Sequence, residues 1–163
     1  MSTPLATMAN WFESLPDEVK NDAGFLMYTG IAGLIGDKDY DMSDAPGDAF
    51  VAWMREDAES FPALSKALLA RAQIRFTMVE DRGSQESWDR ALENNKAVLA
   101  KINDDPTKTS MQEHALKMIS DLPRRAALYM KIAQDWRDTI EPHVTDKALE
   151  EWHFSTLLRN ATS

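Results

Sequence analysis

Apolar residues recur every three or four positions along almost the whole chain, which is the period of an amphipathic α-helix. The spacing predicts eight helices, at about residues 5–15, 16–34, 50–61, 62–81, 85–102, 111–122, 126–140 and 145–159. No segment of useful length alternates strictly between apolar and polar residues, as a half-buried strand would. The predicted fold class is therefore all-α, a compact bundle of about seven to eight helices of unequal length in mixed or orthogonal packing.

Turn-forming residues set the expected ends of these helices. Pro123 follows Asp121 and is expected to separate the sixth helix from the seventh, because proline lacks the N–H that a helix interior needs. Gly83 lies at the end of the fourth helix, where a left-handed cap is expected. One stripe of that fourth helix is expected to face the core: Leu64, Leu68, Ala72, Phe76 and Val79.

Composition indicates how many domains the chain forms and in which compartment the protein is expected. A chain of 163 residues with 44% hydrophobic content has the length of one domain, and we expect a single helical domain over residues 1–163. The absence of cysteine excludes thiolate metal sites and disulfides and fits the cytoplasm. The longest uncharged stretch, residues 23–36, falls short of the roughly 20 residues that span a bilayer. We therefore expect a cytoplasmic protein that does not contact membranes.

The charge is concentrated at one end of the chain. Residues 1–60 contain twelve acidic and three basic residues, whereas residues 61–163 contain fifteen of each. The acidic first third (residues 1–60) therefore accounts for the whole net charge of −9. Direct binding of nucleic acid needs clustered lysine and arginine and is not expected. The sequence instead predicts a basic protein partner.

An aspartate-rich stretch in the acidic first third is the main candidate site, and its members are Asp37, Asp39, Asp41, Asp44 and Asp48. The positions 37, 39, 41 and 48 partly match the ligand spacing of an EF-hand calcium loop. The match fails at its sixth position, where Met42 replaces the glycine of the sharp turn. Three interpretations stay open: a partner-binding surface, a calcium site, and solvated turns with helix caps at Asp44 or Asp48.

Three glycines at a spacing of three lie within the predicted second helix, and they are Gly30, Gly33 and Gly36. Each glycine in a helix interior costs about 1 kcal/mol relative to alanine, so the sequence predicts that another backbone approaches this face closely. Packing inside the domain is one interpretation. A contact between two copies in a homodimer, or a small apolar pocket, is the other.

No catalytic or metal-binding motif is complete. Glu150 and His153 have the Glu-x-x-His spacing of di-iron bundles, but that motif occurs once where such a site needs it twice. His143 and Glu141 lie just upstream, and His114 is expected to be partly buried on the apolar side of its helix. We expect no cofactor, no metal and no enzymatic activity. The predicted function is that of an adaptor or regulator that binds a basic protein, and the alternatives are calcium binding through residues 37–48 and an acidic nucleic-acid mimic that inhibits a DNA-binding protein.

Overall fold

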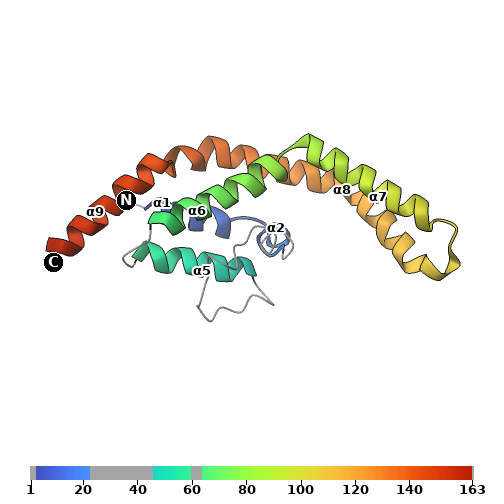
Figure 1. Ribbon diagram of the computed structural model, residues 1–163, viewed down its shortest axis with the longest axis horizontal. Helices are drawn as coiled ribbons and strands as arrows, with labels where there is room; N and C mark the ends of the chain where they lie inside the picture. The colour runs from blue at the N-terminus through green and yellow to red at the C-terminus, as the bar shows by residue number, and fades with distance from the viewer. Residues whose placement is uncertain (1–2, 23–45, 60–63, 163) are drawn as a thin grey trace. The chain divides into compact units, whose positions relative to one another are not determined.

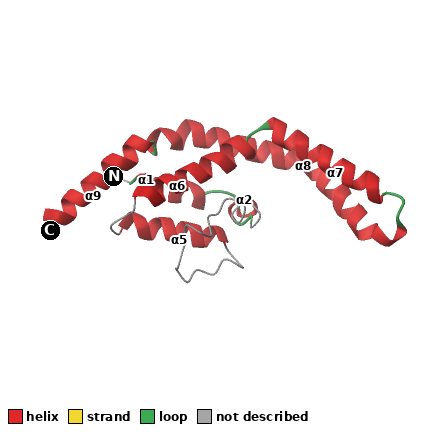
Figure 2. Ribbon diagram, in the orientation of Figure 1, coloured by secondary structure: helices red, strands yellow, loops and turns green. Residues whose placement is uncertain are grey.

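The computed structural model describes residues 3–22, 46–59 and 64–162. Every regular element in these ranges is helical, so the predicted all-α class is confirmed (Figure 2). The α-helices are α1 (Pro4–Glu13), α2 (Asp17–Lys20), α5 (Pro46–Glu59), α6 (Leu64–Ile74), α7 (Gln85–Ile102), α8 (Thr109–Asp135) and α9 (Asp146–Thr162). The π-helical segments η1 (Arg75–Asp81) and η3 (Trp136–Ile140) directly follow α6 and α8, and η2 (Pro106–Lys108) and η4 (Glu141–His143) are short 3-10 segments.

The chain divides into two compact units. The first contains residues 1–75 and 136–163, and the second contains residues 76–135. The single domain expected over residues 1–163 stays a prediction. Across the described ranges, no helix combines the length and the apolar character needed to cross a membrane.

The core of the first unit forms where α1 packs along α5 (Figure 1). Leu5, Met8 and Phe12, which recur on α1 at helical spacing, are fully buried. The ring of Phe12 meets that of Phe50 on α5 edge to face, with centroids 5.1 Å apart. Such aromatic pairs add about 0.5–1.5 kcal/mol to the burial of their area.

The second predicted helix is wrong in its described part. A continuous helix was expected from residue 16 to residue 34, but α2 ends at Lys20, and Asn21 and Asp22 are not helical. The side chain of Asn21 instead accepts a hydrogen bond from the backbone N–H of Gly47, at 3.1 Å. The side chain of Asn21 thus caps the first turn of α5, whose N–H groups have no partner within their own helix. Residues 23–34 lie outside the described residues.

The stripe predicted for the fourth helix is wrong except at its last residue, Val79, which is buried. The other buried side chains are Ala67, Ala70 and Ile74 on α6 and Thr77 and Met78 on η1, whereas Phe76 is 63% exposed. The segment carries two apolar rows, and sequence reasoning chose the one with the larger side chains. The row with two alanines is the buried one, and α6 packs against α9; small residues allow two helices to approach closely.

The sixth and seventh predicted helices form one helix, α8, with Pro123 in its interior. The predicted break is therefore wrong. Leu122 and Ala126, on either side of the proline, are both buried, and α8 packs along α7 over this region. The ring of Tyr129 lies 5.5 Å from that of Trp88 on α7. Burial on both sides of Pro123 offsets the one backbone hydrogen bond that the proline removes.

Gly83 does not adopt the left-handed conformation that was predicted for it. It is needed for close approach instead, because an added Cβ would lie 2.5 Å from the carbonyl oxygen of Val79 and 2.5 Å from the Cβ of Ala133. Next to it, the indole N–H of Trp88 donates to the carbonyl oxygen of Arg82, at 2.5 Å. Glycine is thus required where η1 turns into α7 against α8.

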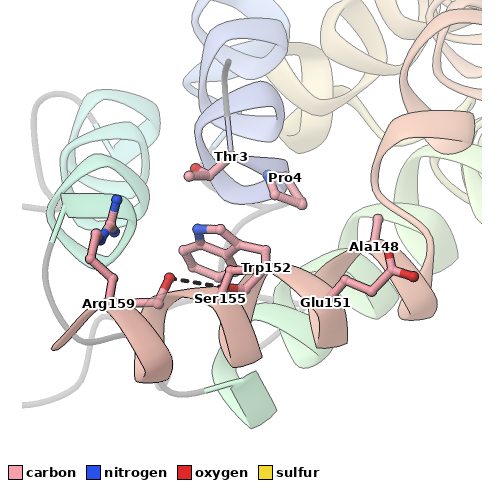
Figure 3. A pocket seen from close by; sticks show the side chains of 8 residues that line it. Thr3, Pro4, Ala148, Glu151, Trp152, Ser155 and Arg159 are labelled. Atoms are coloured by element: carbon pink, nitrogen blue, oxygen red, sulfur yellow. Dashed lines mark hydrogen bonds between the residues drawn. The ribbon is translucent and has the colours of Figure 1, made fainter. Parts of the chain in front are cut away.

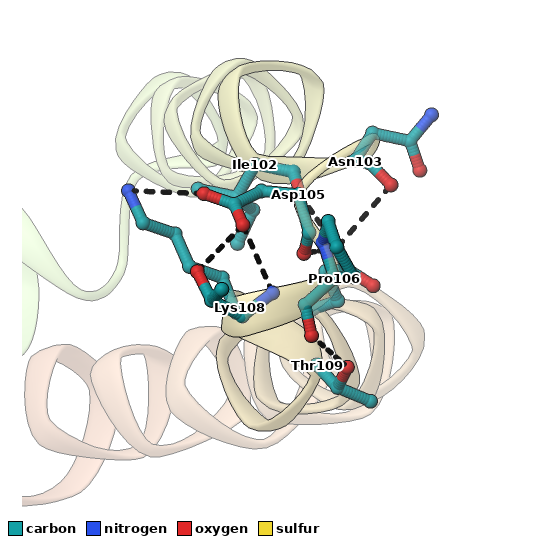
Figure 4. Close-up of polar contacts among 8 residues, drawn as sticks. Ile102, Asn103, Asp105, Pro106, Lys108 and Thr109 are labelled. Atoms are coloured by element: carbon teal, nitrogen blue, oxygen red, sulfur yellow. Dashed lines mark hydrogen bonds and ion pairs between the residues drawn. The ribbon is translucent and has the colours of Figure 1, made fainter.

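Polar contacts fix the connection between α7 and α8 (Figure 4). The side-chain amide of Gln112 donates to the carbonyl oxygens of Ile102 and Asp105, at 2.5 and 3.0 Å. The carboxylate of Asp105 accepts from the hydroxyl and the backbone N–H of Thr107, at 2.6 and 2.9 Å. These two hydrogen bonds, the hydroxyl one first, lower the pKa of Asp105. The link is thus held by local side-chain capping, which favours an antiparallel helical hairpin.

Candidate partner-binding surface

The described part of the aspartate-rich stretch lies where the end of α2 meets the start of α5. Asp48, in the first turn of α5, forms an ion pair with Lys20, with 3.0 Å between Oδ1 and Nζ. Gly47 allows this approach, because a Cβ there would clash with the backbone of Lys20. Asp48 also complements the positive end of the α5 dipole. The carboxylate is exposed, so it serves the helix and remains accessible to solvent.

Lys20 is the cation at this junction. Its side chain is 12% exposed and also lies 3.7 Å from the carboxylate of Asp17. The hydrogen bond to Asp48 raises the pKa of Lys20 above its ordinary value of 10.5. Partial burial lowers this pKa, but the negative charges of Asp48, Asp17 and Glu13 raise it further. Lys20 is thus held in its charged form among carboxylates.

Most of the acidic residues described in the first third face solvent. Glu13, Asp17, Glu18, Asp48 and Glu56 are exposed, and Asp22 is half-buried. Arg55, the second described cation of this third, forms an ion pair with Glu13. Both described cations of the acidic first third are therefore already paired, and the described surface keeps a net negative charge.

Most residues of the two predicted sites cannot be assigned to this surface. Asp37, Asp39, Asp41 and Asp44 lie outside the described residues, as do Gly30, Gly33 and Gly36. Asp48 is the member whose position is known. Asp48 was expected to cap the start of α5. The side chain of Asn21 provides part of that cap, because it accepts a hydrogen bond from the backbone N–H of Gly47.

The histidines are placed differently from what sequence suggested. His114 is exposed on α8, so the expectation that it is partly buried is wrong. Its neighbour Ala115 takes the buried position of that turn. His153 is half-buried on α9 and Glu150 is exposed. Within residues 3–22, 46–59 and 64–162, no three His, Asp or Glu side chains are grouped so as to hold a metal ion.

Glu141 belongs to an ion-pair network that sequence reasoning missed. Its Oε1 atom lies 3.6 Å from Arg71 and 2.5 Å from Arg75, and Arg71 also contacts Asp146 at 2.5 Å. The network ties α6 to η4 and to the start of α9. No local signal predicts it, because the partners lie up to 75 positions apart in the chain.

A second feature that sequence reasoning missed is a pocket of about 520 Å³ between α9 and the start of α1 (Figure 3). Trp152 lies across its floor below Thr3 and Pro4, with Glu151 towards one end and Arg159 towards the other. The neighbouring turns of α9 expose Phe154, Leu157 and Leu158. Their spacing of three and four residues is a readable signal of an apolar row in the sequence.

Comparison of the chain with protein-family models, curated proteins and solved structures finds no match.

Proposed function

We propose that this chain is a non-enzymatic acidic helical protein, an adaptor or regulator, that binds a basic protein partner through its first third. One observation carries the proposal: exposed carboxylates gather in the described part of residues 1–60, while its two cations, Lys20 and Arg55, are already held in ion pairs. A surface of this kind attracts lysine and arginine side chains and repels phosphate. The proposal places the protein in the cytoplasm, since the chain has no cysteine.

The physical effect expected of this surface is faster association. A net charge of −9 concentrated in one third of the chain steers a basic partner towards that third, and salt weakens the attraction. Individual exposed charges contribute little to the free energy of unfolding. Binding and folding can therefore be separated by mutation.

The calcium alternative requires Asp48 as the ligand at the twelfth loop position. The ion pair between Asp48 and Lys20 competes for that carboxylate, which favours partner binding over calcium. The alternative of a nucleic-acid mimic uses the same chemistry and differs in its partner, which would be a DNA-binding protein. The identity of the partner separates these two possibilities.

The test uses the partner isolated from the native host with the wild-type chain as bait. Association rates are measured by stopped flow at a series of salt concentrations for the wild type and for the triple variant D37N/D39N/D41N. We expect the variant to associate several-fold more slowly, with a weaker dependence on salt and an unchanged melting temperature.

The matched control removes three exposed carboxylates from the charge-balanced part of the chain, in the variant E86Q/E93Q/E113Q. This variant loses the same formal charge but should associate almost as fast as the wild type. Equal slowing by both triple variants would show that net charge alone matters and that the first third has no special role. A rate that is independent of salt in the wild type would refute the proposal.

A further inference from the structure

The hairpin of α7 and α8 buries little of the apolar surface that its two helices carry (Figure 1). The 18 residues of α7 include two buried side chains, Trp88 and Ile102, whereas the ten residues of α1 include five. Leu92 and Leu99 are half-buried. A single neighbouring helix covers only part of an apolar stripe about 100° wide. The hairpin therefore leaves apolar surface of the kind that a further helix covers in a bundle.

One side of the hairpin carries no Asp, Glu, Lys or Arg over about two turns of each helix. A pocket of about 270 Å³ opens there between the two helices. Val98 and Met111 on its walls are 46% and 52% exposed. This side is called the neutral face, and it consists of Ala91, Asn94, Asn95 and Val98 on α7 and Ser110, Met111, His114 and Met118 on α8.

The neutral face has the composition of the core of a protein interface. Charged residues are depleted in such cores and methionine is enriched. The same two helices do carry exposed charges, but these lie outside the neutral face, at Glu93, Lys96, Glu113 and Lys117. The lack of charge is thus confined to the side of the hairpin that holds the pocket.

The distribution of charge distinguishes the possible occupants of this face. Residues 76–135 contain ten acidic and nine basic residues, whereas residues 1–75 and 136–163 contain 17 and nine. A basic protein is attracted to the second of these sets and finds no carboxylate on the neutral face. A second copy of the chain carries its excess of negative charge in that same set. Two copies therefore repel each other least where their neutral faces meet.

The polar groups of the neutral face are also suited to contact with a copy of themselves. The side chains of Asn94, Asn95 and Ser110 each contain both hydrogen-bond donors and acceptors. The same residue on two copies can therefore form a hydrogen-bonded pair without a complementary charge. Asparagine in an otherwise apolar helix interface fixes the register of the helices.

From these observations we infer that the chain forms a two-fold symmetric dimer in which the neutral faces of two α7–α8 hairpins pack as a four-helix bundle. Apolar side chains of each copy, Val98 and Met111 among them, cover the pocket of the other. Such symmetric contacts, with the same surface on both subunits, are the commonest form of oligomer. The inference goes beyond the proposed function, because the dimer forms without a basic partner.

The first test measures the mass of the full chain by sedimentation velocity at a series of protein concentrations. We expect the wild type to be a dimer that dissociates on dilution. V98E/M111E should weaken dimerisation about tenfold or more, because it places like charges in the contact. The matched control A100E/L116E adds the same charge to exposed positions of the same two helices outside the neutral face and should dimerise within about twofold of the wild type. Circular dichroism verifies that each variant is folded.

A second test locates the contact without disrupting it. The chain has no cysteine, so a single introduced cysteine reports on one position. H114C should react with a maleimide reagent more slowly at a concentration where the chain is dimeric than after dilution, because the second copy covers the pocket. A100C, on α7 outside the neutral face, should react at the same rate at both concentrations.

Three results would overturn the inference. The first is a wild type that stays monomeric at every concentration. The second is a dimer that both glutamate variants weaken equally, or one in which H114C reacts as fast as in the monomer, since another surface then holds the copies together. The third is protection of H114C that requires the basic partner, because a different protein then covers the neutral face. None of these results bears on association through the first third, which the charge variants described above test separately.

Discussion

Single side chains decide how the start of α5 is held, and they act across a wide gap in the chain. Asn21 accepts from Gly47 and Lys20 pairs with Asp48, although these residues are separated by 26 and 28 positions. Sequence reasoning placed the cap of this helix in the residues next to it, because most helices are capped locally. The signal for a cap supplied from another element is not present in any window of the sequence.

The pair of Lys20 and Asp48 should give the protein a measurable dependence on high pH. The pKa of Lys20 is raised in the folded state above 10.5, so its contribution to stability is present below that pH and is lost as pH rises through the folded pKa. We expect D48N to lower the free energy of unfolding by about 0.2–1 kcal/mol at neutral pH. The difference from the wild type should stay constant up to about pH 9 and shrink above pH 10.5.

Urea titrations at a series of pH values check this expectation, and R55Q provides the control. R55Q breaks the ion pair between Arg55 and Glu13, and arginine keeps its proton throughout this range. The stability difference between the wild type and R55Q should therefore stay constant to pH 11.5. If the stability difference between the wild type and D48N is also constant to pH 11.5, the charge of Lys20 does not stabilise the contact between α2 and α5.

At the scale of the elements, the apolar period predicts the existence of a helix better than its boundaries or its buried face. The helices α1, α7 and α9 begin and end within three residues of their predicted positions. On α9, however, Leu149 and Thr156 form one row and Phe154, Leu157 and Leu158 form another. Both rows have helical spacing, and only the packing partners decide which one is buried. The exposed row was therefore missed although its residues are plain in the sequence.

Proline is the other point at which local signals were misleading. Pro123 removes one backbone hydrogen bond from α8, which would otherwise run from residue 123 to the carbonyl of Ile119. Packing of α8 on α7 keeps the helix continuous. The missing hydrogen bond therefore destabilises the folded protein without breaking the helix. We expect P123A to raise the free energy of unfolding by about 1–3 kcal/mol, because alanine restores the N–H and removes the ring.

Chemical unfolding of P123A measures this gain, and P106A is its matched control. Pro106 is the first residue of η2, where the N–H has no partner in the helix and the fixed backbone angle of proline is favourable. P106A should therefore leave stability unchanged or lower it slightly. A loss of stability in P123A would indicate that the proline fits a kink that α8 needs.

At the scale of the whole molecule, the chain passes between the two units twice, and both passages lie in helical backbone. The first is between Arg75 and Phe76 within η1, and the second is between Asp135 at the end of α8 and Trp136 at the start of η3. Composition and length predict one domain, but they do not show whether two compact units unfold together. Because helical backbone continues through both passages, we expect a single cooperative transition.

Two buried leucines, one in each unit, allow this cooperativity to be tested. Leu149 on α9 belongs to the first unit and Leu122 on α8 to the second, and both are buried. Replacing either leucine with alanine removes buried apolar volume and should cost about 2–5 kcal/mol. If the chain unfolds as one domain, L149A and L122A each shift a single transition, and hydrogen exchange of the most protected amides accelerates in both units. If L122A accelerates exchange within residues 76–135 alone, and L149A only in the other unit, the chain unfolds as two domains and the single-domain prediction is wrong.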